Sequence, residues 1–203
     1  MKWSEHMIAR ALALQIFQRK NLVVVNNCNW TGHECDLLIV THDLRIIDVE
    51  VKISRADFKA DAKKDKWWHR FGGTYVDGKY VEVSPTPRDW PPKVWKHYYA
   101  LPASIWKPEM LECINPNSGV LLLRKGKGSG HLVVDVERRV RSNKDAKNIT
   151  AAQAVDIARL ASLRMWDAYK NMEAARDELR RMRELTQPSR DAAATHHPEE
   201  VME

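Results

Sequence analysis

The sequence predicts an α/β domain, a mixed sheet flanked by helices, with a long helix near its C-terminal end. Apolar residues recur with helical spacing over residues 4–18, and three short runs rich in Val, Ile and Leu follow. A second helical pattern and further strand-like runs come after them. Because 203 residues can bury one sizeable core but hardly two full domains, these elements belong to a single core with appendages.

The first part of this pattern is a helix, a strand and a hairpin. Ser4 is a favourable N-cap for the helix over residues 4–18, and the apolar run at 22–25 indicates a buried strand. Two longer strand patterns follow at 32–40 and 44–53. The short polar segment between them is typical of a hairpin loop, so we expect these two strands to pair antiparallel.

The hairpin carries charged residues on strands that are otherwise apolar. Side chains alternate across a strand, so Asp48, Glu50 and Lys52 share one face. Such groups are costly to desolvate unless they hold a metal or take part in chemistry. Antiparallel pairing brings Asp36 of the preceding strand beside Glu50, and Glu34 shares a face with Asp36. The alternative is an amphipathic strand pair whose charged face is simply solvated.

A second helix follows the hairpin directly. Ser54 is a suitable N-cap for it, and we expect it to run to about Trp68 with Phe58 and Ala62 facing the sheet. Its outer face is strongly basic and carries Arg55, Lys59, Lys63, Lys64 and Lys66, followed by His69 and Arg70. Since this face begins beside Glu50, it suits phosphate contacts that hold a DNA duplex without reading its sequence. Solvated lysines on a surface helix are the alternative.

The middle of the chain alternates irregular and strand-like segments. Residues 74–83 indicate a small hairpin that turns at Asp77-Gly78. Aromatic residues are frequent around it, at Trp68, Tyr75, Tyr80, Trp90 and Trp95. They either stack on unpaired bases or pack the loop onto its own domain, and we favour packing. Strands are expected at 98–101, 119–124 and 131–136, the last two joined by a basic, glycine-rich hairpin turn.

The spacing of the charged residues resembles the motif of the PD-(D/E)XK nuclease superfamily. That motif is an acidic residue, a hairpin, then an acidic residue, any residue and Lys. Asp36 and Glu50-Val51-Lys52 match it, whereas the Pro that gives the motif its first letter is Cys35 here. The superfamily core runs helix, three strands, helix, strand, often with a Glu on the first helix, where this chain has Glu5.

A closer resemblance, over residues 4–165 with gaps, is to bacterial MmcB-type DNA repair proteins and their phage relatives. It runs from Ser4 through Asp57-Phe-Lys-Ala-Asp61 and on to Tyr98-Tyr-Ala-Leu-Pro102. Residues 72–96 look like an insertion relative to these proteins. The fold that both resemblances imply is a restriction-endonuclease-like core.

The activity that the resemblance implies is metal-dependent cleavage of DNA. Mg²⁺, for which Mn²⁺ can substitute, binds through one or two carboxylates, keeps several waters and contacts the phosphate. Asp36 and Glu50 supply the carboxylates, and the backbone carbonyl of Val51 adds a third oxygen. Lys52 orients or deprotonates the attacking water, and Glu5 assists. Glu34 is a candidate ligand of a second ion.

The implied setting is DNA repair, recombination or phage DNA processing. Two alternatives stay open: a Holliday-junction-resolvase-like enzyme that selects DNA shape, and a non-catalytic DNA-binding module on the same fold. RNA also stays open as a substrate. The balance of 33 Lys and Arg against 27 Asp and Glu, with a pI of about 9.2, suits a polyanionic partner without identifying it.

Cysteine content and hydropathy indicate the compartment. Three Cys residues, irregularly spaced, do not form a disulfide framework, which favours a reducing environment. Cys28, His33 and Cys35 match no common zinc-finger spacing, so we do not expect zinc. No apolar run approaches the roughly twenty residues that cross a bilayer, and the N-terminus carries Lys2, Glu5 and His6 in place of a signal core. We expect a soluble cytoplasmic protein without membrane contact.

The C-terminal part of the chain is one long helical pattern. Thr150 and Gln153 form a capping box, and the helix continues to about Leu185. Small and apolar residues recur in alternating steps of four and three, as in a coiled coil: Ala154, Ala158, Ala161, Met165, Ala168, Met172, Ala175, Leu179 and Met182. We expect the first half to pack on the core and the second half to pair with another helix, for example in a homodimer. The predicted division is therefore a core at 1–147, a helix at 148–187 and a disordered tail at 188–203.

Overall fold

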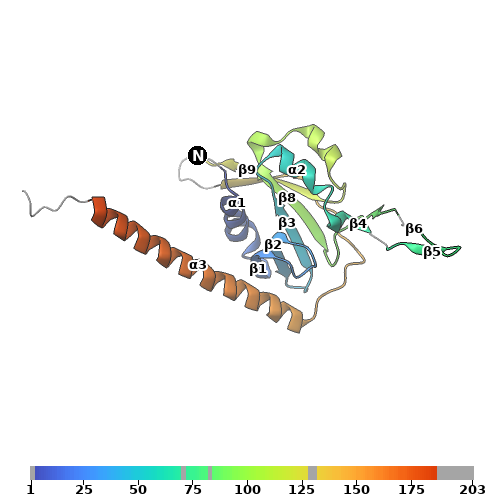
Figure 1. Ribbon diagram of the computed structural model, residues 1–203. Coiled ribbons are helices and arrows are strands. Elements are labelled where there is room, and N and C mark those ends of the chain that lie inside the picture. Colours follow the sequence, from blue (N-terminus) through green and yellow to red (C-terminus); the bar gives the residue numbers. More distant parts are fainter. Residues whose placement is uncertain (1–2, 70–71, 82–83, 128–131, 187–203) are drawn as a thin grey trace, which may run out of the picture. The chain divides into compact units, whose positions relative to one another are not determined.

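The computed structural model of the chain describes residues 3–69, 72–81, 84–127 and 132–186. It has the predicted α/β architecture, with a six-stranded mixed sheet in the order β1-β2-β3-β8-β9-β10 and a long C-terminal helix (Figure 1). The chain forms two compact units, Met1–Ser162 and Leu163–Glu203. The expected order of helix, three strands, helix and strand is confirmed in the first unit.

The N-terminal helix α1 spans Glu5–Leu12 and continues as a π-helical turn over Ala13–Phe17. Its predicted N-cap is confirmed, because the Ser4 hydroxyl accepts a hydrogen bond from the backbone N–H of Met7 at 3.3 Å. The strand β1, Asn21–Cys28, follows and pairs antiparallel with β2.

The predicted hairpin is formed by β2, Cys35–Thr41, and β3, Ile46–Val51. The two strands are antiparallel, with Leu37 opposite Val49 and Leu38 opposite Asp48. Continued by one residue, this register puts Asp36 level with Glu50, as the sequence predicted.

The second helix is shorter than predicted. Ser54 caps α2 as expected, accepting a hydrogen bond from the Asp57 backbone N–H at 3.1 Å, but α2 spans only Arg55–Asp61. A 3-10 turn over Asp65–Trp67 replaces the expected continuation to Trp68. The helix ends early because the following residues turn inward: the Trp67 indole N–H donates to Asp61 at 3.1 Å, and the Lys66 side chain is buried.

Short strands fill the segment that follows. β4, Trp68–His69, pairs with β7, Thr86–Pro87, and β5, Thr74–Val76, pairs with β6, Lys79–Val81. The predicted turn at Asp77-Gly78 is confirmed, with φ of 49° and 76°. The prediction that the aromatic residues pack onto the domain is wrong for the two tyrosines of this hairpin. Tyr75 and Tyr80 are 74% and 59% exposed, and their rings contact each other edge to face with their centroids 5.6 Å apart. A strand of three residues offers them too little surface to cover.

The remaining strands complete the sheet beside β3. β8, Lys96–Pro102, is parallel to β3 and to β9, Gly119–Lys125, while β10, Leu132–Arg138, is antiparallel to β9. Two 3-10 segments, Ala103–Ile105 and Pro108–Cys113, connect β8 to β9. The three predicted strands are therefore confirmed.

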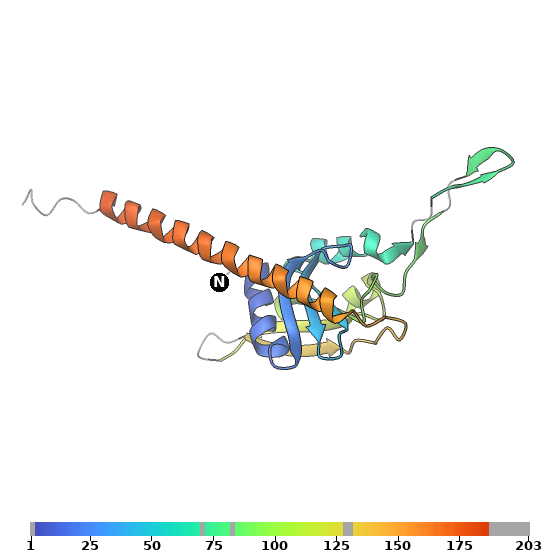
Figure 2. The ribbon, with the colours of Figure 1, turned by 90° about the horizontal axis from the view of Figure 1, so that it is seen from below.

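The sheet is covered on both faces. Ile8 and Leu12 of α1 pack on one face against Ile39 and Val49, whereas Phe58 of α2 packs on the other face against Tyr99 and Leu101. Figure 2 shows the ribbon of the sheet and its helices from a second direction. The alternation of side chains therefore sends Asp48 and Glu50 of β3, and Lys52 one residue after its end, toward α2. This placement buries all three charged residues between the sheet and α2.

The C-terminal helix α3 spans Ala151–Thr186. Its capping box is confirmed by reciprocal bonds between Thr150 and Gln153, at 2.9 and 3.2 Å. The expected packing of its first half is confirmed near its start, because Ala154 and Ile157 are buried against the sheet. In the second unit the described residues are exposed, among them Trp166, Leu179 and Leu185. The predicted tail lies outside the described residues.

The length and hydropathy of the described helices bear on membrane crossing. None of the helices in this part of the chain combines the length and the apolar character that a membrane span requires.

Candidate functional site

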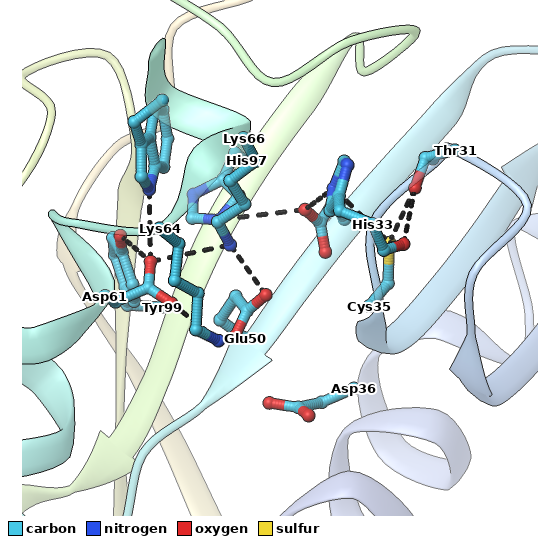
Figure 3. A network of polar contacts seen from close by, with 12 residues as sticks. Thr31, His33, Cys35, Asp36, Glu50, Asp61, Lys64, Lys66, His97 and Tyr99 are labelled. Atoms are coloured by element: carbon cyan, nitrogen blue, oxygen red, sulfur yellow. Dashed lines mark hydrogen bonds and ion pairs between the residues drawn. The ribbon is translucent and has the colours of Figure 1, made fainter. Parts of the chain in front are cut away.

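Six charged side chains meet between β3 and the segment that begins with α2. We call them the carboxylate–lysine cluster: Asp48, Glu50, Asp61, Lys52, Lys64 and Lys66. Figure 3 labels Glu50, Asp61, Lys64 and Lys66 of this cluster. β3 supplies Asp48 and Glu50 through strand alternation, and Lys52 follows the strand by one residue. α2 supplies Asp61, and the inward turn after α2 supplies Lys64 and Lys66. The early end of α2 is therefore what closes this cluster.

Glu50 is the centre of the cluster and is 1% exposed. Its Oε1 accepts a hydrogen bond from Lys66 Nζ at 2.6 Å, and its Oε2 accepts from Lys52 at 2.7 Å and from Lys64 at 3.3 Å. Burial raises the pKa of Glu50, but the positive charges of Lys66 and Lys52 outweigh burial and hold the pKa below its ordinary value. Glu50 is therefore ionised and fully paired.

Asp61 anchors the other side of the same cluster. Its carboxylate accepts hydrogen bonds from the Tyr99 hydroxyl at 2.5 Å and the Trp67 indole at 3.1 Å, and it forms ion pairs with all three lysines, the shortest to Lys64 at 3.0 Å. Burial raises the pKa of Asp61, but Lys66 and the other partners outweigh burial, so the pKa lies below its ordinary value. The pKa of Lys66 is raised, because nearby carboxylates outweigh the effect of burial. The cluster is thus a network of ionised groups.

Asp36 lies beside this network but has a different environment. It is half-buried on β2, and its Oδ2 accepts a hydrogen bond from the Val51 backbone N–H at 2.6 Å. No ion pair within the described residues involves it. Burial and then the charge of Glu50 raise the pKa of Asp36 to about 6. Asp36 is therefore a carboxyl group without an ion-pair partner among the described residues.

A small pocket of about 150 Å³ opens next to Asp36. Glu5 and His6 of α1 and Val51 of β3 line it together with Asp36. Glu50 and Lys52 do not line it, because they point toward α2 and are 1% and 3% exposed. Three acidic residues of the expected site thus lie close together, but only Asp36 and Glu5 face the pocket.

The structure brings most of the predicted site residues together. Asp36, Glu50, Val51 and Lys52 are neighbours on two paired strands, and Glu5 reaches the same place from α1. Glu34 is exposed before β2 and takes no part in the pocket or in the carboxylate–lysine cluster.

The predicted DNA-binding lysines have mixed outcomes. Arg55, Lys59 and Lys63 are exposed, as expected for a basic outer face. Lys66 is not on that face: its side chain is 1% exposed and is paired with Glu50, because the chain leaves the helix before reaching it. Arg70 lies outside the described residues.

The sequence did not identify Asp61 of the cluster, nor His97, which borders the cluster. Asp61 follows Phe58 by three residues, so the expected sheet-facing side of α2 already included it. His97 of β8 is fully buried, and its Nε2 lies 3.4 Å from Lys66 Nζ. Strand alternation puts His97 on the same face of the sheet as Tyr99 and Leu101. No pattern in the sequence shows, however, that the strand of His97 lies beside β3.

Comparisons with known proteins add the following. Neither a protein-family model nor a curated protein matches the chain. Among solved structures, the SPO1766 protein of unknown function from Silicibacter pomeroyi is similar, with 18% identity and a TM-score of 0.48. The alignment covers 88% of this chain and 95% of that chain.

Proposed function

We propose that this protein is a metal-dependent DNA endonuclease whose site is formed by Asp36, Glu50 and Lys52. The observation that carries the proposal is the environment of Asp36. Its carboxyl group lies next to the ionised Glu50 at an open pocket, has no ion-pair partner among the described residues, and has a pKa raised to about 6. Such a place favours a divalent cation.

The donor set fits Mg²⁺. Carboxylate and backbone carbonyl oxygens are hard ligands, and Asp36, Glu50 and Val51 supply them. Both oxygens of Glu50 are already bound to ammonium groups, so Glu50 has to exchange one partner for the ion. Lys64 is the partner best placed to leave, because its side chain is 48% exposed, against 3% for Lys52 and 1% for Lys66.

The protein groups have separate roles in the proposed reaction. A bound Mg²⁺ supplies Lewis-acid stabilisation of the phosphate and a more acidic water. Lys52, held 2.7 Å from Glu50, donates to the attacking water or to a phosphate oxygen and offsets the charge that develops on phosphorus. Lys66 and Asp61 fix Glu50 and Lys52 in place. Glu5 borders the pocket and assists as an acceptor for solvent.

The substrate contacts come from the exposed side of α2. Arg55, Lys59 and Lys63 are exposed on the helix that follows the site strand, so they can contact consecutive phosphates. These contacts position DNA without selecting a sequence. We propose DNA repair, recombination or phage DNA processing as the setting, with a cytoplasmic location, and a homodimer through α3.

The complete pairing of Glu50 favours a second candidate function. Three ammonium groups already neutralise the Glu50 and Asp61 carboxylates. A non-catalytic DNA-binding module on the same fold needs the same neutralisation, because buried charges without partners destabilise a protein. The two functions differ in whether Asp36 binds a cation that the reaction uses.

Cleavage assays separate the two functions. Purified protein is incubated with Mg²⁺ or Mn²⁺ and single-stranded, duplex, nicked or four-way-junction DNA, with and without chelator. An endonuclease cuts at least one of these DNAs and stops on chelation, and a preference for the junction identifies a resolvase. Binding without cleavage of any of them supports the non-catalytic module and contradicts the proposal.

A further inference from the structure

A second group of metal-ligating side chains lies on the far side of Asp48 from the lysines. His33 Nε2 is 3.0 Å from Asp48 Oδ2 and 3.7 Å from Cys35 Sγ. The three ligand atoms all lie within 4.8 Å of one another. Four-coordinate zinc, with bonds of about 2.0–2.3 Å, separates its ligands by roughly 3.3–3.8 Å. The cluster is therefore close to the size of a zinc site without any movement of the backbone.

Asp48 has an unsatisfied oxygen in this group. The residue is fully buried. Its Oδ1 has no hydrogen-bond partner in the part of the chain that the structure describes, whereas its Oδ2 is hydrogen-bonded to His33. A buried carboxylate oxygen without a partner is costly, and a hydrogen bond between His33 and Asp48 alone does not remove that cost. A cation that binds Oδ1, alone or together with Oδ2, does remove it, so this oxygen is a second observation that points to a ligand.

The group is also accessible and held in place. The His33 side chain is 13% exposed, so an ion can enter past it, while Asp48 and Cys35 are closed off. Thr31 Oγ1 lies 3.5 Å from Cys35 Sγ and donates to the His33 backbone carbonyl at 2.9 Å, which ties the loop before β2 to the group. Figure 3 shows His33 and Cys35 directed toward the same point beside β3.

His97 borders the group but has other partners. Its Nδ1 lies 2.9 Å from the Ser118 hydroxyl, and its Nε2 lies 3.4 Å from Lys66 Nζ and 3.8 Å from Asp48 Oδ2. Because Lys66 occupies the Nε2 side, the three ligands are His33, Cys35 and Asp48, and the fourth position is left to water.

We propose that His33, Cys35 and Asp48 form a binding site for Zn²⁺ or a similar borderline-soft divalent cation. A thiolate, an imidazole and one carboxylate select such an ion over Mg²⁺, which prefers oxygen ligands. Binding releases the thiol proton of Cys35 to solvent, because zinc binds the thiolate. The ion links β3 to the loop before β2, two segments separated along the chain.

The site differs from one formed by Cys28, His33 and Cys35, whose spacing matches no common zinc finger. Local spacing offered no fourth ligand, and Asp48, which replaces Cys28 in the group, comes from the neighbouring strand. The inference does not depend on the proposed nuclease function, because Asp36 and Glu50 are not among its ligands.

Cobalt titration of the full-length chain tests the site. Metal-free protein is titrated with Co²⁺, and the absorption band from thiolate-to-cobalt charge transfer is followed; zinc retained after dialysis is measured separately. The wild-type chain is expected to bind one ion with this band. Cys35→Ser should abolish the band, whereas Cys113→Ser, which alters a cysteine outside the group, should leave it unchanged. Cobalt bound by the histidines at 196 and 197 does not give this band, because the charge transfer requires a thiolate ligand.

Two further variants keep the result interpretable. His33→Ala, at the exposed edge of the group, is expected to fold and to weaken zinc binding at least about 100-fold, since losing a group that only orients a ligand already costs about 10- to 100-fold. Asp36→Ala should bind zinc as the wild type does while losing cleavage, which separates this inference from the nuclease proposal. No thiolate band in the wild type, a band that survives Cys35→Ser, or unchanged zinc affinity in His33→Ala overturns the inference.

Discussion

Replacing Asp36 by Asn is expected to stabilise the protein above pH 6 while removing its cation site. Burial and the charge of Glu50 raise the pKa of Asp36 from 3.8 to about 6, so ionising this carboxyl group opposes folding. Folding therefore takes up protons between about pH 4 and pH 6, and the stability of the wild type falls as pH rises through this range. Asn does not ionise, and its side-chain oxygen can still accept the hydrogen bond from Val51.

The size of the effect follows from the two pKa values. The difference between 3.8 and about 6 corresponds to roughly 3 kcal/mol, at 1.36 kcal/mol for each pKa unit. Asp36 is only half-buried, so solvent screening reduces this figure, and we expect a gain of about 1–3 kcal/mol at pH 8. The gain should shrink below pH 6 and be nearly absent at pH 4.

Urea denaturation from pH 4 to pH 8 measures this gain, with Asp145→Asn as a control at an exposed aspartate. The control should change stability by less than about 0.5 kcal/mol. Mg²⁺ at ten times its Kd should add about 1.4 kcal/mol to the wild type and nothing to Asp36→Asn. A variant that is less stable than the wild type at pH 8, or that Mg²⁺ stabilises equally, refutes the account of Asp36.

Three more outcomes follow from the structure. Lys66→Met should lower the free energy of unfolding by roughly 3–5 kcal/mol, because it leaves Glu50 short of a buried partner, whereas Lys63→Met on the exposed face should change it by less than about 0.5 kcal/mol in the same urea assay. Replacing Arg55, Lys59 and Lys63 by Gln should weaken DNA binding for all sequences. The slope of the logarithm of the DNA-binding constant against the logarithm of the salt concentration should also fall by about one for each lost phosphate contact, as measured by fluorescence anisotropy. A chain cut after residue 169 should sediment as a monomer and the full chain as a dimer.

Contrary results are equally specific. Stability that is unchanged in Lys66→Met means that Glu50 does not depend on that ion pair. DNA affinity that falls for some sequences alone means that the α2 residues read bases, and equal association states in the two chains exclude a dimer through the second half of α3.

The hairpin and its charged residues could be predicted because local patterns determine them. Strand alternation placed Asp48, Glu50 and Lys52 on one face, and the register of the hairpin placed Asp36 beside Glu50. Hydroxyl caps at Ser4 and Ser54 likewise depend on neighbours within three residues.

The state of the site could not be predicted in the same way. Helical spacing put Lys66 on an exposed face, but the buried carboxylates Glu50 and Asp61 attract its ammonium group, and the chain leaves the helix to satisfy them. The partners of Asp48 lie 15 and more residues away, since His33 precedes β2 and His97 lies on β8. Long-range charge balance of this kind leaves no periodic signal.

The most direct test of the central claim is DNA cleavage by the wild type and by Asp36→Ala, with DNA binding measured in the same buffer. Asp36 is preferable to Glu50 here, because removing Glu50 leaves three lysines with Asp61 as their one shared carboxylate among the described residues. The account predicts that the wild type cuts DNA with Mg²⁺ and that Asp36→Ala binds DNA equally well without cutting it. Mg²⁺-dependent cutting by Asp36→Ala at the wild-type rate would contradict the account.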